Sequence, residues 1–349
     1  MPDAAHVLVV APNWLGDAVM ALPALADIRR AHPQARLTVA ARPSVAPLYG
    51  MVPGVDRTIV NHWRGSLTDR ASLDDFAQSV RAHNVDLAIL FPNSFASAWA
   101  VRRAGVRERC GYATDLRRPL LTRAVRRPGG PLHQGKYYQH LVRELGMPAG
   151  DLEPVVEVPG SAIDEARSLL ADRGWRSSGL LIVIAPGAAY GAAKRWLPEH
   201  FGAMVIQVIQ KTGAQCAIVG TAGDAATTSE VLAAIDPVSR GSVIDLTGAT
   251  SLPVLAGVLT LAAACVSNDS GAMHLAGAVG APLAALFGPT RDRETAPLTR
   301  HGGRAELLIN QVWCRPCMLR ECPIDHRCMT GLRPERVCTS VLALMERVS

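Results

Sequence analysis

Aromatic residues and long apolar runs are scarce in this 349-residue sequence. Phe, Trp and Tyr make up 5% of the chain, although hydrophobic residues make up 49%. This composition is typical of helices rich in Ala, Leu and Val that pack on sheets. No apolar stretch reaches the roughly 18 residues expected of a membrane-spanning helix, and the first residues lack the basic region of a signal peptide. We therefore expect a soluble, cytoplasmic protein.

Two common nucleotide-binding motifs are also missing. Gly187, Gly191 and Lys194 have the wrong spacing for the dinucleotide motif G-x-G-x-x-G and for the P-loop G-x-x-x-x-G-K-[ST]. These absences argue against an NAD enzyme and against a P-loop ATPase. There is also no D-x-D motif to hold a metal ion.

Acidic residues are rare in one basic stretch, residues 101–143, where Glu108 and Asp115 stand against eleven basic residues. These are Arg102, Arg103, Arg107, Arg109, Arg117, Arg118, Arg123, Arg126, Arg127, Lys136 and Arg143. Such a stretch suggests phosphate groups on a partner, which would be a nucleic acid, an anionic membrane surface or a phosphorylated substrate. A solvated, arginine-rich face is the alternative.

The length suits two domains of ordinary size, and both halves alternate short apolar strands with helical stretches, which predicts an α/β fold with doubly wound parallel sheets. We expect one lobe over residues 1–155, a linker within 151–161, a second lobe over 162–333 and a terminal helix over 334–349. Expected strands are 7–11, 37–41, 57–60, 87–91, 180–185, 215–219, 265–269 and 283–287. Expected helices are 18–31, 43–50, 73–83, 163–173, 252–262, 270–279 and one that begins at Pro198.

The segment Ser267-Asn-Asp-Ser-Gly-Ala-Met-His274 joins an apolar strand to a helix and is predicted to bind an anion. The first N–H groups of such a helix lack partners and point at the turn. We expect Asp269 or Ser270 to cap the helix, Gly271 to admit the ligand closely, and His274 to face it. An ordinary capped helix is the alternative.

Two further loops, Gly187 to Arg195 and Gly220 to Asp224, follow strands and should reach the same edge of the second sheet. Lys194 and Arg195 beside a helix N-terminus would neutralise a pyrophosphate without a metal ion. A surface Lys-Arg pair is the alternative.

Asp17 follows Gly16 at the start of a helix in the first lobe. If the strand ends of the two lobes oppose each other, it faces the space between them, where a carboxylate could act as a general base toward a sugar hydroxyl. Asp is also common near helix starts for structural reasons alone. The turn Pro92-Asn-Ser-Phe95 follows another strand of this lobe, at the edge where open α/β sheets bind ligands.

Cys314, Cys317, Cys322 and Cys328 have the spacing C-x2-C-x4-C-x5-C, which permits a structural zinc site. Free thiols in a reducing cytoplasm are the alternative. The other four cysteines are expected to be buried apolar residues.

Five segments in order resemble the bacterial lipopolysaccharide heptosyltransferases, which are glycosyltransferases of the GT-B architecture, with two Rossmann-like lobes and a ligand cleft between them. They are Pro12-Asn-Trp-Leu-Gly-Asp17, Phe91-Pro-Asn-Ser-Phe95, Pro186-Gly-Ala-Ala-Tyr-Gly-Ala-Ala-Lys-Arg-Trp196, Asn268-Asp-Ser-Gly-Ala-Met-His274 and Leu286-Phe-Gly-Pro289. Within the family, Pro12-Asn-Trp14 and the Pro-Asn-Ser loop look like the enzymes that add the second heptose.

The resemblance implies an ADP-heptose donor, a heptosyl-Kdo2-lipid A acceptor, inversion at the anomeric carbon and no metal cofactor. It implies Asp17 as general base and Lys194 as the diphosphate ligand. Donor contacts are expected from Gly187, Lys194, Arg195, Asp224, Asn268, Asp269, Ser270, Gly271 and His274, with Asp224 a weaker match for the family's acidic residue on the nucleoside. Acceptor contacts are expected from Asn13, Asn93, Ser94, Arg117 and Arg118.

The basic stretch then suits a phosphorylated lipid headgroup or the inner face of the cytoplasmic membrane, where the protein would be peripheral. A family member that adds the first heptose, or another glycosyltransferase of the same family (family 9), is one alternative. A nucleic-acid-binding protein with a zinc site would explain the arginines and cysteines, but not the three anion loops. An epimerase acting on a nucleotide sugar would explain the anion site without an acceptor.

Overall fold

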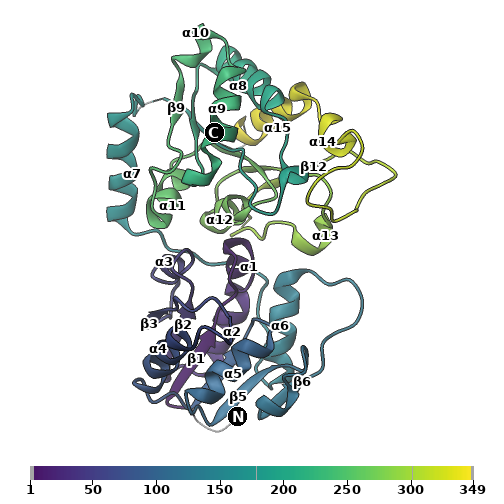
Figure 1. The fold of residues 1–349 in the computed structure, drawn as a ribbon. Helices are drawn as coiled ribbons and strands as arrows, with labels where there is room; N and C mark the ends of the chain where they lie inside the picture. The colour runs from purple at the N-terminus through teal and green to yellow at the C-terminus, as the bar shows by residue number, and fades with distance from the viewer. Residues whose placement is uncertain (1–3, 178, 301, 347–349) are drawn as a thin grey trace. The chain divides into compact units, whose positions relative to one another are not determined.

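The computed structural model describes residues 4–346 apart from 178 and 301. The chain divides into two compact units between Glu157 and Val158, inside the stretch expected as the linker. Each unit is a six-stranded parallel sheet with helices on both faces (Figure 1). The expectation of two doubly wound α/β lobes is confirmed.

The first unit has strand order β3-β2-β1-β4-β5-β6. Its strands are β1 (His6–Val10), β2 (Arg36–Ala41), β3 (Arg57–Val60), β4 (Leu87–Leu90), β5 (Glu108–Tyr112) and β6 (Arg123–Val125). Its helices are α1 (Leu15–Met20), α2 (Leu22–Ala31), α3 (Ala46–Tyr49), α4 (Arg70–Arg81), α5 (Phe95–Arg103), the 3-10 turn η1 (Arg118–Leu120) and α6 (Gln134–Glu144). All residues of β1 and β4 are buried because helices cover both faces of the sheet.

The differences of this unit from the sequence expectation include one divided helix and two unexpected strands. The single helix expected over 18–31 is two helices that meet at Ala21. Pro23 lies in the first turn of α2, and because proline has no N–H it cannot continue the hydrogen-bond ladder of α1. Strands β5 and β6 lie inside the basic stretch and were not expected, because their charged side chains obscure the apolar pattern.

The second unit has strand order β12-β11-β10-β7-β8-β9. Its strands are β7 (Leu181–Ala185), β8 (Gln215–Ile218), β9 (Val243–Asp245), β10 (Ala264–Asn268), β11 (Leu283–Phe287) and β12 (Ala305–Ile309). Its helices and 3-10 turns are α7 (Gly160–Asp172), η2 (Ala192–Lys194), α8 (Pro198–Thr212), η3 (Ala222–Asp224), α9 (Ala225–Ala233), α10 (Pro237–Arg240), α11 (Leu252–Thr260), α12 (Gly271–Val279), α13 (Asp292–Thr295), α14 (Arg327–Thr330) and α15 (Pro334–Glu346).

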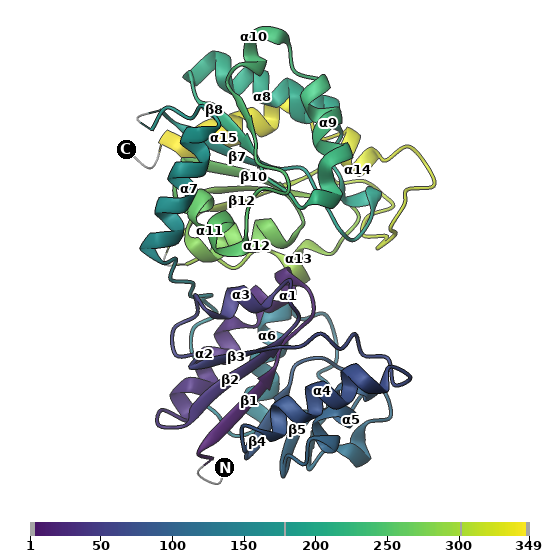
Figure 2. The same ribbon diagram turned by 60° about the vertical axis from the view of Figure 1, so that its left-hand side comes forward.

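Helices α8 and α15 cover one face of the second sheet, where Phe201 and Val337 share a core cluster with strand residues such as Ile184 (Figure 2). On the other face α7 packs on α11. A Cβ on Gly257 of α11 would lie 2.6 Å from the Ala162 carbonyl oxygen, so this close approach requires glycine. The terminal helix is thus part of the second unit rather than a separate segment; residues 347–349 of the expected helix lie outside the described residues.

Both sheets have a point where the direction of strand addition reverses. In the first unit it lies between β1 and β4, and in the second between β7 and β10. Loops at the carboxyl ends of these strand pairs are where open α/β sheets bind ligands. Among the described residues, no helix is both long and apolar enough to cross a membrane.

Candidate functional site

The loops after β7 and β10 meet at the switch point of the second sheet through Asn268. Its Nδ2 donates to the Pro186 carbonyl at 2.7 Å, and its Oδ1 accepts from the Trp196 N–H at 3.0 Å. The convergence expected for these two loops is therefore confirmed. The side chain of Asn268 is fully buried and both ends of its amide bind the backbone. In this structure its amide joins two loops, and its donor contact stays a prediction.

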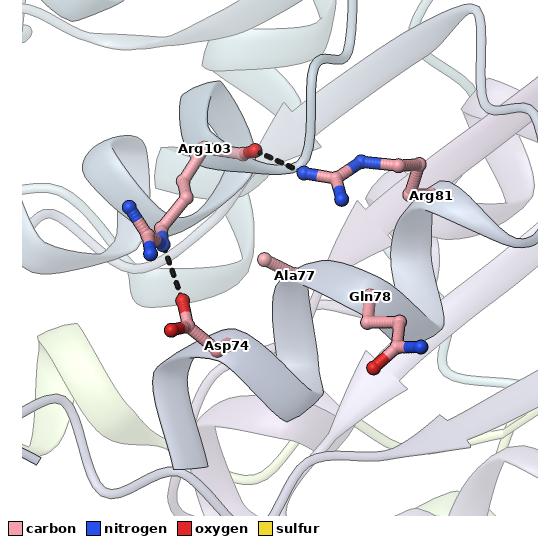
Figure 3. Close-up of a pocket in the computed structure, with 5 residues that line it drawn as sticks. All are labelled: Asp74, Ala77, Gln78, Arg81 and Arg103. Carbon is pink, nitrogen blue, oxygen red and sulfur yellow. Dashed lines mark hydrogen bonds and ion pairs between the residues drawn. The ribbon is translucent and has the colours of Figure 1, made fainter. Parts of the chain in front are cut away.

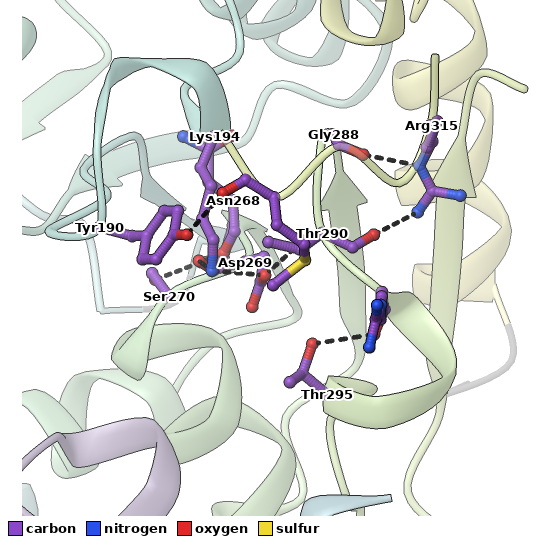
Figure 4. A network of polar contacts seen from close by, with 12 residues as sticks. Tyr190, Lys194, Asn268, Asp269, Ser270, Gly288, Thr290, Thr295 and Arg315 are labelled. Atoms are coloured by element: carbon purple, nitrogen blue, oxygen red, sulfur yellow. Dashed lines mark hydrogen bonds and ion pairs between the residues drawn. The ribbon is translucent and has the colours of Figure 1, made fainter. Parts of the chain in front are cut away.

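Lys194 forms a buried ion pair with Asp269 at this edge (Figure 4). Lys194 Nζ lies 2.7 Å from Asp269 Oδ2, and the side chains are 13% and 5% exposed. The same oxygen accepts a 2.7 Å hydrogen bond from the Thr290 hydroxyl. The ammonium group also lies 4.9 Å from the centre of the Tyr190 ring, within cation–π range. These contacts fix the Lys194 charge beside the start of α12.

The N-terminus of α12 is available to an anion. Ser270 is the N-cap residue, and no side chain accepts a hydrogen bond at this cap. The Ser270 hydroxyl instead lies 3.2 Å from that of Ser267. Asp269 does not cap the helix, because its carboxylate is turned toward Lys194. His274 is buried in the first turn, and Gly271 is half-buried.

Gly187 and Asp224 bring the loop after β8 to the same place. A Cβ on Gly187 would lie 2.4 Å from Asp224 Oδ1, so a larger residue here would clash with the carboxylate. The donor contact of Gly187 stays a prediction. Asp224 Oδ2 accepts hydrogen bonds from the N–H and the hydroxyl of Thr221 at 2.9 and 2.7 Å, closing a capping box around η3. Whether Asp224 contacts a nucleoside remains a prediction.

Arg195 does not join Lys194 as a paired cation. Its Nη1 donates to the Thr227 hydroxyl at 3.2 Å, which directs the guanidinium toward α9. The two consecutive side chains contact different elements, and their shared role at one pyrophosphate stays a prediction.

In the first unit, Asp17 and Asn93 both lie beside helix α6. Asp17 is a half-buried residue of the first turn of α1. Burial raises the pKa of Tyr138 on α6 well above its ordinary value, and the nearby Asp17 carboxylate raises it further. Asn93 Nδ2 donates to the Tyr137 hydroxyl at 2.9 Å. The structure thus places the proposed base and the polar turn near the switch point of the first sheet.

The other two polar residues expected at the acceptor have local partners. Ser94 is the N-cap of α5 and its side chain accepts from the Ser97 N–H. Asn13 is exposed, and its Oδ1 accepts from Arg42 Nε at 2.9 Å. Their contacts with an acceptor remain predictions.

Arg117 is a structural residue and not part of a basic surface. Its side chain is fully buried, its Nε donates to the Tyr112 carbonyl at 2.8 Å, and its Nη1 donates to the Pro92 carbonyl. Burial lowers its pKa to about 10. The guanidinium holds the turn after β4 from inside, and its acceptor contact stays a prediction. Arg118 is exposed and remains a candidate.

The cysteines of the segment 314–328 are free thiols; Cys317 and Cys322 are exposed, Cys314 is half-buried and Cys328 is buried. In the described part of the chain, no three His, Cys, Asp or Glu side chains are grouped so that they could hold a metal ion. A zinc site at these cysteines is thus not preassembled, and it remains a prediction.

Sequence reasoning missed the role of the loop after β11. Thr290 belongs to this loop, and Arg315 holds it by donating to the Gly288 carbonyl at 2.6 Å and to the Thr290 carbonyl at 3.2 Å (Figure 4). The available signal was the segment 286–289, which resembles the family but was assigned no role.

A surface pocket between α4 and α5 lies in the first unit (Figure 3). Arg103 is paired with Asp74, and Arg81 donates to the Arg103 carbonyl at 2.9 Å. Because these arginines already have partners and the pocket is formed by helices, away from the strand ends, we do not assign the candidate site to it.

Two parallel Rossmann-like sheets with loops at their switch points form the GT-B architecture. The structure of E. coli ADP-heptose LPS heptosyltransferase II is similar, with a TM-score of 0.84, 26% identity and coverage of 98% of this chain and 99% of that chain. A family model described as glycosyltransferase family 9 (heptosyltransferase) matches residues 74–327.

The chain therefore belongs to glycosyltransferase family 9, the heptosyltransferases, and is an enzyme of the glycosyltransferase class. Lipopolysaccharide heptosyltransferase 2 of Escherichia coli K12 is 30% identical over 97% of this chain and 98% of its own length. Lipopolysaccharide heptosyltransferase 2 of Salmonella typhimurium is 32% identical over 87% of this chain and 88% of its own length.

Proposed function

We propose that the protein transfers L-glycero-D-manno-heptose from ADP-heptose to the first heptose of heptosyl-Kdo2-lipid A, with inversion at the anomeric carbon. Two relatives are named lipopolysaccharide heptosyltransferase 2, and the similar E. coli structure is that of an ADP-heptose heptosyltransferase, which supports this choice. The site in the second unit supports it independently of those names.

The observation that carries the proposal is the Lys194–Asp269 pair beside the uncapped start of α12. A diphosphate can bind to the Lys194 ammonium and to the first N–H groups of the helix. A carboxylate accepts hydrogen bonds but repels phosphate, so Asp269 suits a sugar hydroxyl. One cation, one helix start and one carboxylate thus match the two parts of a nucleotide sugar.

In the reaction, the acceptor hydroxyl oxygen forms a bond to the anomeric carbon on the face opposite ADP. The bond between that carbon and the phosphate oxygen breaks, and ADP leaves with the electron pair. Asp17 accepts the hydroxyl proton. Lys194 and the helix start stabilise the charge that develops on the diphosphate, which is the role a metal ion has in other transferases. We therefore propose a metal-independent enzyme.

The acceptor is a lipid, and we propose that the protein acts as a peripheral protein at the inner face of the cytoplasmic membrane. Arg118 in η1 and the other exposed arginines of the stretch 101–143 support this, since clustered basic side chains are attracted to anionic headgroups. No role in nucleic-acid binding is proposed.

Incubation with ADP-heptose and each purified acceptor, analysed by mass spectrometry, tests the function. We expect heptosyl-Kdo2-lipid A to gain one heptose and Kdo2-lipid A to gain none. Addition to Kdo2-lipid A instead would identify an enzyme that adds the first heptose. Conversion of ADP-heptose without acceptor would indicate an epimerase, and salt-sensitive binding to DNA in place of transfer would favour the nucleic-acid alternative.

A further inference from the structure

The cysteine-rich segment, defined as residues 314–328, folds against the loop that carries Lys194. The Tyr190 hydroxyl donates to the Met318 carbonyl at 2.7 Å. The Ala193 N–H donates to the Arg320 carbonyl at 2.9 Å. His326 Nε2 lies 2.7 Å from the Ala193 carbonyl oxygen. Three hydrogen bonds thus join the segment to the five residues that end at Lys194.

Close packing accompanies these hydrogen bonds. A Cβ on Gly191 would lie 2.4 Å from the Arg320 carbonyl oxygen, so any larger residue would push the two backbones apart. The Arg320 guanidinium lies 5.4 Å from the centre of the Tyr190 ring, which also contacts Lys194. The loop therefore depends on the segment for its path.

The same segment also holds the loop after β11. Arg315 donates to the Gly288 and Thr290 carbonyls and pairs with Asp292 at 2.9 Å, and its side chain is 4% exposed. Thr290 and Lys194 both donate to Asp269. One segment thus fixes both loops whose side chains meet at the candidate donor site.

We propose that the cysteine-rich segment positions the Lys194 loop and that His326 is its principal positioning residue. Ala193 directly precedes Lys194, and both its backbone N–H and its carbonyl oxygen are bound by the segment. Because a carbonyl only accepts, His326 Nε2 carries the proton, as it can in the neutral ring and does in the charged ring. This proposal rests on the proposed function only for the identity of the nucleotide sugar that the loop binds.

Two substitutions of His326 distinguish loss of its hydrogen bond to Ala193 from a change in the local backbone conformation. His326 has a φ of 55°, a left-handed conformation that asparagine tolerates well. His326→Asn keeps that conformation but is too short to reach Ala193, whereas His326→Gln restores a terminal N–H donor at longer reach. Arg327→Gln is the matched control, because it removes a surface ion pair with Asp325 in the same segment.

We expect His326→Asn to raise the donor KM and the ADP Kd about tenfold, the effect of losing one well-placed hydrogen bond. His326→Gln should remain within about threefold of the wild type, and Arg327→Gln should be unchanged. Acceptor KM should not move in any variant. Equal effects of Asn and Gln, or a lower kcat with unchanged ADP Kd, would overturn the positioning role.

Tryptic cleavage after Lys194 and Arg195 in the native protein gives a test that needs no substrate. A loosened loop exposes these bonds, so His326→Asn should be cleaved several-fold faster than the wild type and His326→Gln should not. Unchanged cleavage in all variants would refute the inference even if heptose transfer is confirmed. Faster cleavage in His326→Asn would support it even if the donor is another nucleotide sugar.

Discussion

Replacing Lys194 with methionine removes the cation from a buried ion pair and leaves Asp269 with the Thr290 hydroxyl as its remaining donor among the bonds described. Breaking a buried pair by removing one partner destabilises a protein by about 3–5 kcal/mol. We use the lower end, about 3 kcal/mol, since Thr290 still satisfies the carboxylate. For a unit of this size, that loss corresponds to a fall in Tm of about 6–12 °C.

The double variant Lys194→Met/Asp269→Asn separates stability from catalysis. A neutral amide needs no cation, so the double variant should recover most of the Tm lost in Lys194→Met. Its kcat/KM should nevertheless stay about 10²- to 10³-fold below the wild type, because the charge on the departing diphosphate has lost its stabilising cation. Calorimetry gives the first quantity and transfer kinetics the second.

Lys211→Met is the control, because Lys211 is an exposed lysine of α8. It should leave both Tm and kcat/KM close to the wild type. If Lys194→Met melts within about 2 °C of the wild type, the pair with Asp269 contributes little, and the magnitude argued from its burial is wrong. If its donor KM and kcat are both retained, Lys194 does not bind the diphosphate.

Three further predictions concern other parts of the chain. Asp17→Asn should lower kcat at least about 10²-fold and leave the ADP Kd, measured by calorimetry, unchanged; retained turnover would remove Asp17 from the mechanism. Arg118→Glu should raise the acceptor KM without changing Tm. Arg117→Met should lower Tm, because it removes the hydrogen bonds of a buried guanidinium to backbone carbonyl groups. The reverse pattern would contradict the burial of Arg117. Iodoacetamide at pH 8 should label the exposed Cys317 quickly and leave Cys110 unlabelled. Burial raises the pKa of Cys110 to about 12, so little of its reactive thiolate is present at pH 8. Protection of Cys317, together with stoichiometric zinc by elemental analysis, would establish the metal site.

The sequence was most informative for strands that are buried on both faces. Leu283–Phe287 begins and ends where expected, since buried parallel strands are short apolar runs between turns. Strand β5 was not predicted, because Glu108 and Arg109 interrupt its apolar run. A charged residue can remain in such a strand when its side chain finds backbone partners, and Arg109 donates to the Val106 and Leu120 carbonyls.

Two residues of the candidate donor site were named from the sequence, but the contact between them was not. Lys194 and Asp269 were both expected at the donor, yet they are 75 residues apart and their pairing follows only from the order of the strands. Arg117 shows the opposite limit. A count of basic residues treats every arginine as a surface charge, whereas the burial of one guanidinium depends on carbonyl groups at Tyr112 and Pro92 that no local pattern reveals.

The two sheets have the same topology, since β7 to β12 are arranged in the same order as β1 to β6. A fold that contains the same layout in two copies offers evolution two equivalent ligand positions on separate cores. We propose that the first unit binds the acceptor and the second unit binds ADP-heptose. Mutations near the switch point of the first sheet can then change which sugar is extended, while the donor site at the switch point of the second sheet is inherited unchanged. Diversity of acceptors within the family would then arise by divergence of one half of the chain.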